Sequence, residues 1–298
     1  MKDNISSTTP HNFPCFGTSN YVKLRGLNFH YLSWGDINKP LIIMLHGFMD
    51  HSHTFDLLAF NLMNDYQIIA WDARGFGRTE WIHPSGYYHF FDYLYDLELF
   101  IDYLNAENVT IIGHSMGGII ATLYAGTFPE KVNNLVNIEG WFINESSFND
   151  APTRAKRWIE EVKNIKDSKS IKDLEDASLR LRRVDNLMSI DVSEHLAYEG
   201  TKKEFDNLYW RYDNLHRTRA PQQTYIKQIE SFWKNITCPV LFLKGEKSNF
   251  DLSGSQQLSN SFNNMKYVEV KESGHNLHLH QPIQVSKIID TFLSSNEN

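Results

Sequence analysis

The stretch that decides the fold reads Val109-Thr110-Ile111-Ile112-Gly113-His114-Ser115-Met116-Gly117-Gly118-Ile119-Ile120-Ala121. An apolar run leads directly into Gly113, and a segment of helical character follows Ser115. Strand, tight turn and helix form the setting of a G-x-S-x-G nucleophile elbow, in which the turn exposes the serine hydroxyl above the sheet. The flanking glycines remove side chains that would collide with the neighbouring strand and helix. We therefore predict that Ser115 is a nucleophile.

Continuous apolar runs bounded by turn residues recur on both sides of the elbow, at residues 41–45, 67–71, 135–138 and 240–243. Such runs are typical of strands buried on both faces of a parallel sheet. Segments with helical spacing of apolar residues lie among them, at residues 91–104, 119–128 and 282–293. Before them, alternating runs at 21–24 and 27–32 predict a β-hairpin. The alternation of strands and helices predicts an α/β domain with right-handed crossovers.

Residues 144–235 break this alternation, because they are charged, helix-like and without a comparable buried-strand run. We expect helices there at 151–165, 170–181 and 193–198. The predicted organisation is a polar lead-in at 1–20, an α/β core at 21–143 and 236–298, and a helical cap at 144–235 inserted into that core.

The amino-acid composition limits the kinds of molecule that this protein is expected to bind. The net charge is −7, with 36 acidic and 29 basic residues, which disfavours binding to a nucleic-acid backbone. We expect no signal peptide and no membrane span, because no apolar segment approaches the required ~20 residues. The two cysteines, Cys15 and Cys238, match no paired metal spacing and are interpreted as free thiols of a cytoplasmic protein. Nothing in the sequence indicates the oligomeric state.

A second motif, Leu45-His46-Gly47-Phe48, follows directly on the apolar run 41–45. With this motif the chain resembles the α/β-hydrolase fold family, over most of its length outside the cap and the first ~20 residues. The resemblance implies an oxyanion hole in which the backbone N–H of Phe48 is one donor, with the N–H of Met116 as the second. His46 is then expected to brace the loop. The block 72–79 resembles the family's D-x-R-G-x-G-x-S loop, so Asp72 and Arg74 are expected to form a structural hydrogen-bonded corner.

A base for Ser115 is expected near the C-terminus, after a strand at 265–270. The family places it in a Gly-His pair, here Gly274-His275, with a proline opening the final helix at Pro282. His275 is therefore the predicted base, because a serine hydroxyl needs an imidazole to accept its proton. His278 and His280 share no helix face with His275, so no metal site is predicted. His51 and His53 follow the expected oxyanion loop; a place at the border of the pocket is one alternative, but loop histidines are more often solvated, so we expect them to be solvated.

The acid of the triad has two candidates. The family's commonest pattern is G-x-x-D after the strand at 240–243, but Gly245-Glu246-Lys247-Ser248 has a serine there, and Asp251 comes three residues later. Glu139 ends the strand at 135–138, where the haloalkane dehalogenase and coelenterazine-luciferase branch carries its acid, and the serine-hydrolase-like branch is similar. All core strands present their carboxyl ends to one edge, so either carboxylate can reach His275. We predict Glu139.

A serine nucleophile forms an acyl-enzyme, so the substrate must offer an acyl carbon. Epoxide-hydrolase and dehalogenase relatives use an aspartate at this position, and Ser115 excludes their alkyl-enzyme chemistry. We predict a carboxylesterase-like serine hydrolase for a small to medium ester that needs no metal or organic cofactor. A thioesterase, a C–C bond hydrolase and a weakly catalytic ligand receptor on the same fold remain alternatives. The predicted candidate walls of the substrate pocket are aromatic: Trp141, Phe142, Trp158, Tyr209, Trp210 and Tyr212.

Overall fold

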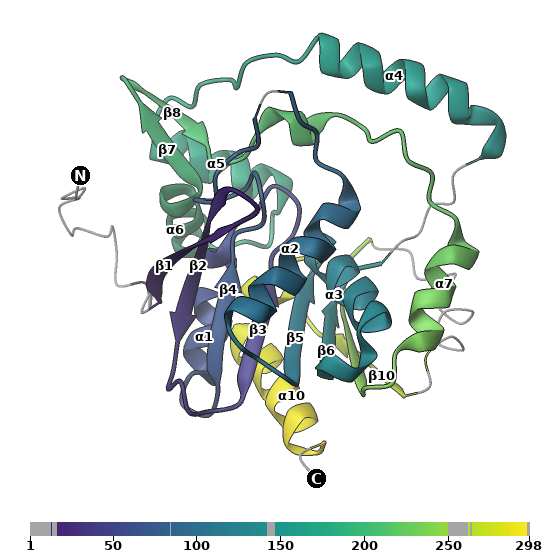
Figure 1. Ribbon diagram of the computed structural model, residues 1–298. Coiled ribbons are helices and arrows are strands. Elements are labelled where there is room, and N and C mark those ends of the chain that lie inside the picture. Colours follow the sequence, from purple (N-terminus) through teal and green to yellow (C-terminus); the bar gives the residue numbers. More distant parts are fainter. Residues whose placement is uncertain are drawn as a thin grey trace.

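The computed structural model describes residues 13, 17–83, 85–141, 147–249, 262 and 264–296. Its centre is an eight-stranded sheet of order β1-β2-β4-β3-β5-β6-β9-β10 (Figure 1). The first two strands form the predicted antiparallel hairpin, and β2 pairs antiparallel with β4. From β4 to β10 every neighbouring pair is parallel. The strands are β1 (Thr18–Leu24), β2 (Leu27–Trp34), β3 (Leu41–Leu45), β4 (Gln67–Trp71), β5 (Val109–His114), β6 (Val132–Ile138), β9 (Val240–Gly245) and β10 (Met265–Val270).

Helices cover both faces of this sheet, as its apolar strands require. On one face lie α1 (Asp56–Leu62) and α10 (Pro282–Ser294), and on the other α2 (Phe90–Tyr103), α3 (Met116–Thr127) and α7 (Ile226–Asn235) (Figure 1). Successive residues of a strand point to opposite faces. Accordingly, Ile43 and Leu45 pack into the core under α2 and α3, whereas Ile42 and Met44 pack under α1 and α10. The predicted α/β architecture is confirmed.

The insertion between β6 and β9, described over residues 147–235, is mostly helical. In chain order it contains η3 (Phe148–Asp150), α4 (Ala151–Lys163), α5 (Leu174–Val184), α6 (Ile190–Gly200), β7 (Thr201–Glu204), β8 (Asn207–Trp210), η4 (Asn214–Arg217) and α7. Its expected helical character is wrong at β7 and β8, which pair antiparallel. Their pattern is hard to recognise because Lys202-Lys203-Glu204 is polar and the hairpin is largely exposed.

Helix α7 lies at the end of the range 144–235 predicted for the cap, but it packs beside the core sheet. Its apolar face packs on the core, where Trp233 stacks on Trp141 at a centroid distance of 4.9 Å. The Asn235 side-chain amide donates to the Gly126 carbonyl at the end of α3, at 2.7 Å. This helix therefore belongs to the layer that flanks the sheet, and only the preceding part of the insertion lies over the carboxyl ends of the strands (Figure 1).

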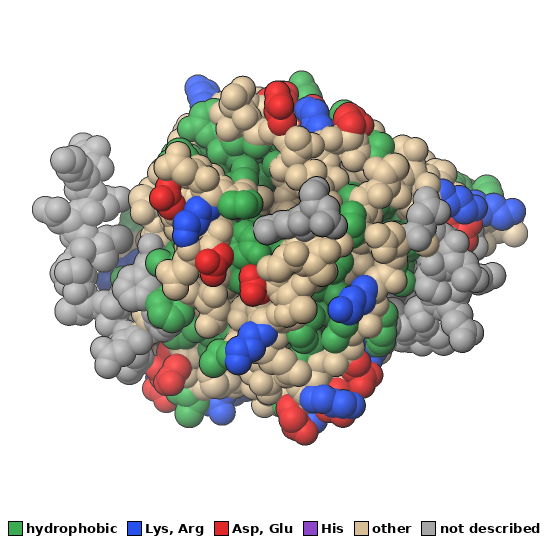
Figure 2. Space-filling view, turned by 90° about the horizontal axis from the view of Figure 1, so that it is seen from below, with side chains coloured by type: hydrophobic (Ala, Val, Ile, Leu, Met, Phe, Trp, Pro, Cys, Tyr) green, Lys and Arg blue, Asp and Glu red, His purple; other side chains and the backbone are tan. Residues whose placement is uncertain are grey.

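Short elements complete the described chain: η1 (Ser52–Phe55) before α1, η2 (Pro129–Lys131) before β6 and α9 (Leu277–His280) before α10. None of the described helices is long and apolar enough to cross a membrane. On the face seen from below, away from the insertion, Lys and Arg side chains are interspersed with Asp and Glu (Figure 2).

Candidate active site

Ser115 occupies the sharp turn between β5 and α3. Its backbone has φ 51° and ψ −116°, a left-handed conformation that is uncommon for a residue with a side chain. The turn is held because the Ser115 N–H donates to the Ile138 carbonyl of the adjacent strand, at 2.9 Å. The elbow geometry predicted from Gly113-His114-Ser115-Met116-Gly117 is therefore present, with Ser115 directly before the amino end of α3.

The elbow requires glycines because the backbones of β3, β5 and α3 approach one another closely there. A Cβ at Gly117 would lie 2.0 Å from the Leu45 carbonyl oxygen, and one at Gly113 would lie 2.3 Å from the Gly117 carbonyl oxygen. Both separations are far inside van der Waals contact, so strand, turn and helix pack this closely only without side chains here.

The loop after β3 lies against the nucleophile. A Cβ at Gly47 would come within 3.4 Å of the Ser115 Cβ, which places the Gly47–Phe48 backbone beside the serine. His46 braces this loop: its Nδ1 donates to the Gly47 carbonyl at 2.7 Å, while its Nε2 accepts from the Ala73 N–H at 3.0 Å. Met116 is the first residue of α3, so its N–H has no acceptor within the helix. Phe48 and Met116 thus flank Ser115 with backbone amides.

His275 and Glu139 are in direct contact. The His275 Nδ1 lies 2.7 Å from the Glu139 Oε2, and the carboxylate is fully buried while the imidazole is 40% exposed. Glu139 reaches this position from the end of β6, where its own φ is 51° and its N–H donates to the Leu243 carbonyl of β9 at 3.1 Å. The imidazole is thereby fixed with Nδ1 toward the acid.

The Glu139 carboxylate accepts two further hydrogen bonds. Gly245 N–H donates to its Oε1 at 2.8 Å, and the Ser248 hydroxyl donates to its Oε2 at 2.7 Å. Ser248 occupies the position where the commonest family pattern has the acid. The sequence therefore marked this position as close to His275, but it did not predict that Ser248 donates a hydrogen bond to Glu139. The alternative acid, Asp251, lies outside the described residues.

A network missed from the sequence holds the loop that carries His275. The Asp185 carboxylate, just after α5 in the insertion, accepts from the Asn276 amide at 2.6 Å and from the His280 Nε2 at 2.9 Å. The His280 Nδ1 in turn accepts from the Gly274 N–H at 3.1 Å, which fixes the tautomer of His280. The residues on both sides of His275 are therefore tied, directly or through His280, to one carboxylate of the insertion.

Ser115, His275 and Phe48 line one cavity of about 540 Å³ between the core and the insertion. Among the described residues the Ser115 hydroxyl makes no hydrogen bond. The relation of Ser115 to His275 is therefore that both side chains line this cavity. Of the expected aromatic walls, Trp210 and Tyr212 line it; Trp141 instead packs in the core, and Phe142 lies outside the described residues. Trp158 and Tyr209 are absent from the lining, whose apolar part is Met49, Leu181, Val184, Met188, Leu196 and Leu279.

Two titratable side chains after β3, Asp50 and His51, border the same cavity. Burial raises the pKa of the Asp50 carboxyl to about 6, against the opposing effects of His46 and of the His51 N–H that donates to it. Burial, together with nearby His53, lowers the pKa of His51 to about 3. Asp50 is therefore a carboxyl that titrates near neutral pH, and His51 is a neutral imidazole.

Asp72 and Arg74 are structural, as expected, but they do not pair with each other. The buried Asp72 carboxylate accepts from His30 Nδ1 at 2.7 Å and from the backbone N–H groups of Ser52 and Arg78. Arg74 instead forms a two-pronged ion pair with Asp96 of α2. Each side chain anchors the loop after β4 to a different neighbour.

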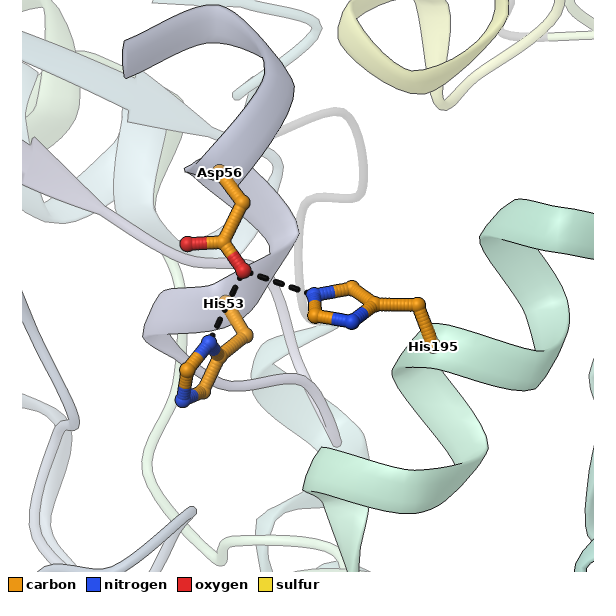
Figure 3. A group of neighbouring side chains, drawn as sticks. All are labelled: His53, Asp56 and His195. Atoms are coloured by element: carbon orange, nitrogen blue, oxygen red, sulfur yellow. Dashed lines mark hydrogen bonds and ion pairs between the residues drawn. The ribbon is translucent and has the colours of Figure 1, made fainter. Parts of the chain in front are cut away.

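The expectation that His51 and His53 are solvated is wrong, since both are buried. His53, Asp56 and His195 form a group with ligand atoms close enough to hold a metal ion (Figure 3). However, Asp56 Oδ2 lies 2.8 Å from His53 Nδ1 and 2.6 Å from His195 Nε2, which are hydrogen-bond distances. We interpret the group as a bridge that holds α6 to the start of α1.

Known proteins share the sequence pattern and the fold of this chain. The family model described as "alpha/beta hydrolase fold" matches residues 40–282. The chain belongs to this family.

Among curated relatives, the human protein named serine hydrolase-like protein 2 is 25% identical over 280 residues, covering 88% of this chain and 89% of the relative. Human epoxide hydrolase 4 is 36% identical over 129 residues, covering 42% of this chain and 35% of that protein. Among solved structures, the thioesterase domain from the curacin biosynthetic pathway superposes with a TM-score of 0.83 at 24% identity, covering 92% of this chain and 98% of that one. At this identity the likeness shows the fold alone.

Proposed function

We propose that this chain is a serine hydrolase that cleaves small to medium carboxylic esters through an acyl-enzyme. The observation that carries the proposal is the elbow at Ser115, in one cavity with a His275 whose Nδ1 is 2.7 Å from Glu139. The relative named serine hydrolase-like, which aligns over nearly all of both chains, supports the same class.

In the proposed reaction, His275 Nε2 accepts the Ser115 proton as Oγ forms a bond to the acyl carbon. The carbonyl oxygen becomes an oxyanion, which the N–H groups of Phe48 and Met116 stabilise; one such donor is typically worth about 10²- to 10³-fold in rate. His275 then gives its proton to the departing alcohol as the C–O bond breaks. Water, deprotonated by His275, releases the acid and restores Ser115. Glu139 keeps Nδ1 protonated and stabilises the imidazolium.

Epoxide hydrolysis is a less suitable proposal despite the epoxide hydrolase named among the relatives. Opening an epoxide through a covalent intermediate gives an alkyl ester of the nucleophile, which water cleaves at the nucleophile's own carbonyl. Ser115 has no carbonyl in its side chain, so an alkylated Ser115 would be a stable ether. Acyl transfer returns the serine hydroxyl unchanged.

The insertion is proposed to act as the cap of this site, because its residues Trp210, Tyr212 and Leu181 line the same cavity as Ser115. We also propose a cytoplasmic location. Cys238 is a buried free thiol whose pKa burial raises to about 12, as suits a thiol that stays reduced.

The test is turnover of chromogenic p-nitrophenyl esters of graded chain length, beside thioesters of the same acids. Ester hydrolysis that disappears in Ser115→Ala supports the proposal, and the ratio of ester to thioester rates decides between esterase and thioesterase. Covalent labelling of Ser115 without turnover of any acyl substrate would support the receptor alternative.

A further inference from the structure

Three arginines of the insertion line the cavity that contains Ser115: Arg180, Arg211 and Arg217. Arg180 is neutralised, because it forms a bidentate pair with Asp176 one turn earlier on α5. Arg211 and Arg217 form no ion pair within the part of the chain that the structure describes. In a protein with a net charge of −7, two guanidinium groups without a carboxylate partner at the proposed active site call for an explanation.

Arg211 follows β8 directly and is partly buried. Its Nε donates to the Thr201 carbonyl at 2.9 Å, which fixes one edge of the guanidinium; its terminal N–H groups have no acceptor among the described residues. Burial, reinforced by nearby Arg78, lowers the pKa of Arg211, and the more distant carboxylates of Glu199 and Asp72 offset this only in part. The surroundings of Arg211 thus disfavour its positive charge. A bound anion beside the guanidinium would offset this unfavourable desolvation.

Arg217 is exposed at the mouth of the same cavity and is held in place by an aromatic ring. Its Cζ lies 5.3 Å from the centroid of the Tyr212 ring, and its NH2 donates to the Tyr212 hydroxyl. A planar guanidinium held at one side keeps further N–H groups for a carboxylate or phosphate. Arg217 also borders a second cavity of about 820 Å³ beneath α4, which shares Arg180, Trp210 and Tyr212 with the first.

The carboxylates that line the first cavity do not neutralise these arginines. Asp185 accepts from Asn276 and His280, and Asp50 accepts from the His51 N–H. The cavity therefore presents two guanidinium groups that no lining carboxylate pairs with, at Arg211 and Arg217, beside an apolar wall of Leu181, Met188 and Leu279.

From this arrangement we infer an anion subsite made by Arg211 and Arg217, so that the substrate is an ester or thioester that also bears a carboxylate, phosphate or sulfate group. The inference rests on the proposed function and specifies its substrate class. An apolar acyl segment would lie along the leucine side, and the anionic group would form charge-assisted hydrogen bonds with the two guanidinium groups.

The kinetic experiment compares three p-nitrophenyl esters of matched length: pentanoate, the mono-ester of glutarate and the ester of 4-phosphonobutyrate. We expect kcat/KM for the better anionic ester to exceed that for pentanoate by about tenfold or more. Arg211→Gln and Arg217→Gln should each reduce this ratio by about threefold or more, and the double variant should bring it to about one. Arg219→Gln is the matched control, because Arg219 pairs with Glu161 and lies outside this cavity; it should keep the wild-type ratio. Comparing glutarate with phosphonobutyrate distinguishes a carboxylate from a phosphate-like group.

A binding measurement makes the test independent of turnover. By titration calorimetry, the mono-amide of glutarate or the amide of 4-phosphonobutyrate should bind at least about tenfold more tightly than the neutral pentanamide, and the double variant should lose that difference. No preference for the anionic compounds in the binding measurement, or a preference that survives in the double variant, overturns the subsite. Failure of the proposed function is distinguishable, because it would leave the calorimetric preference intact while no ester is hydrolysed and Ser115 stays unlabelled.

Discussion

The Oε2 of Glu139 lies 2.7 Å from the Nδ1 of His275, although 136 positions separate the two residues. The sheet order explains the contact, since Glu139 ends β6 and His275 follows β10, with β9 between them. The carboxyl ends of all three parallel strands meet at one edge. The Glu139 carboxylate, which we propose as the acid, thus approaches from the strand before the insertion, and the Ser248 hydroxyl after β9 donates a hydrogen bond to it.

Replacing this acid by its amide should remove most of the activity. In Glu139→Gln the side chain cannot accept from Gly245, Ser248 and His275 together, because its NH2 group must face one of these donors. We expect kcat for ester hydrolysis to fall by about 10²- to 10⁴-fold. Ser248→Ala, which removes one donor only, should cost about tenfold or less. Full activity in Glu139→Gln together with loss in Asp251→Asn would assign the acid role to Asp251.

The carboxylate of Asp185 should act on the rate through the loop of His275. Asp185→Ala frees the Asn276 amide and His280, so we expect kcat to fall about tenfold while KM changes less, with an unchanged circular-dichroism spectrum. Glu175→Ala, on the exposed side of the same helix, is the control and should behave as wild type. If Asp185→Ala changed only the melting temperature, its role would be structural.

Asp50 predicts a pH dependence of stability. Its pKa is about 6 in the folded state and about 3.8 in the unfolded chain, so the folded state binds the proton more tightly. Stability should therefore decrease as pH rises from about 4 to about 6, and the loss persists above that. Asp50→Asn keeps an acceptor for the His51 N–H and should stabilise the protein by about 1–2 kcal/mol at pH 8, below the full effect because the side chain borders the cavity. Urea unfolding at pH 8 and pH 4.5 checks this, and an equal gain at both values would contradict it.

Gly117 should tolerate no side chain. In Gly117→Ala the added methyl group would meet the Leu45 carbonyl at 2.0 Å, so β3, the elbow and α3 must separate. We expect a loss of about 3 kcal/mol or more in the free energy of unfolding. At Gly86 an added methyl group would lie 3.1 Å from the flexible end of Ile82 and 3.3 Å from the His83 carbonyl oxygen, so Gly86→Ala should cost less than about 1 kcal/mol. Similar melting temperatures for the two variants would show that the elbow is less tightly packed.

The sequence predicted the parts of the fold that depend on burial on both faces. The apolar runs 41–45 and 67–71 coincide with β3 and β4. The hairpin β7–β8 escaped prediction because β7 is polar and both strands are only four residues long, too short for an apolar period to mark them. The packing of α7 on the core was not predictable, because the apolar face of a helix does not reveal which surface it covers; Trp233 in fact stacks on Trp141.

The candidate site was predictable where a motif fixes local geometry, as at Ser115, and where strand ends must converge, as at Glu139. Contacts made across the insertion were not predictable. Asp185 lies 91 positions before Asn276, and His195 lies 139 positions after Asp56, so neither partner shows in any local pattern. The burial of His51 and His53 was likewise unpredictable, because it is α6, far along the chain, that covers their loop and shields it from solvent.

The central claim, that Ser115 is the nucleophile, is tested most directly by labelling the folded protein with a fluorophosphonate and mapping the modified peptide by mass spectrometry. We predict one adduct on Ser115, absent in Ser115→Ala and formed at least about 100-fold more slowly in His275→Ala. An unlabelled Ser115 in the folded protein, or an adduct on another serine that persists in Ser115→Ala, would contradict the account.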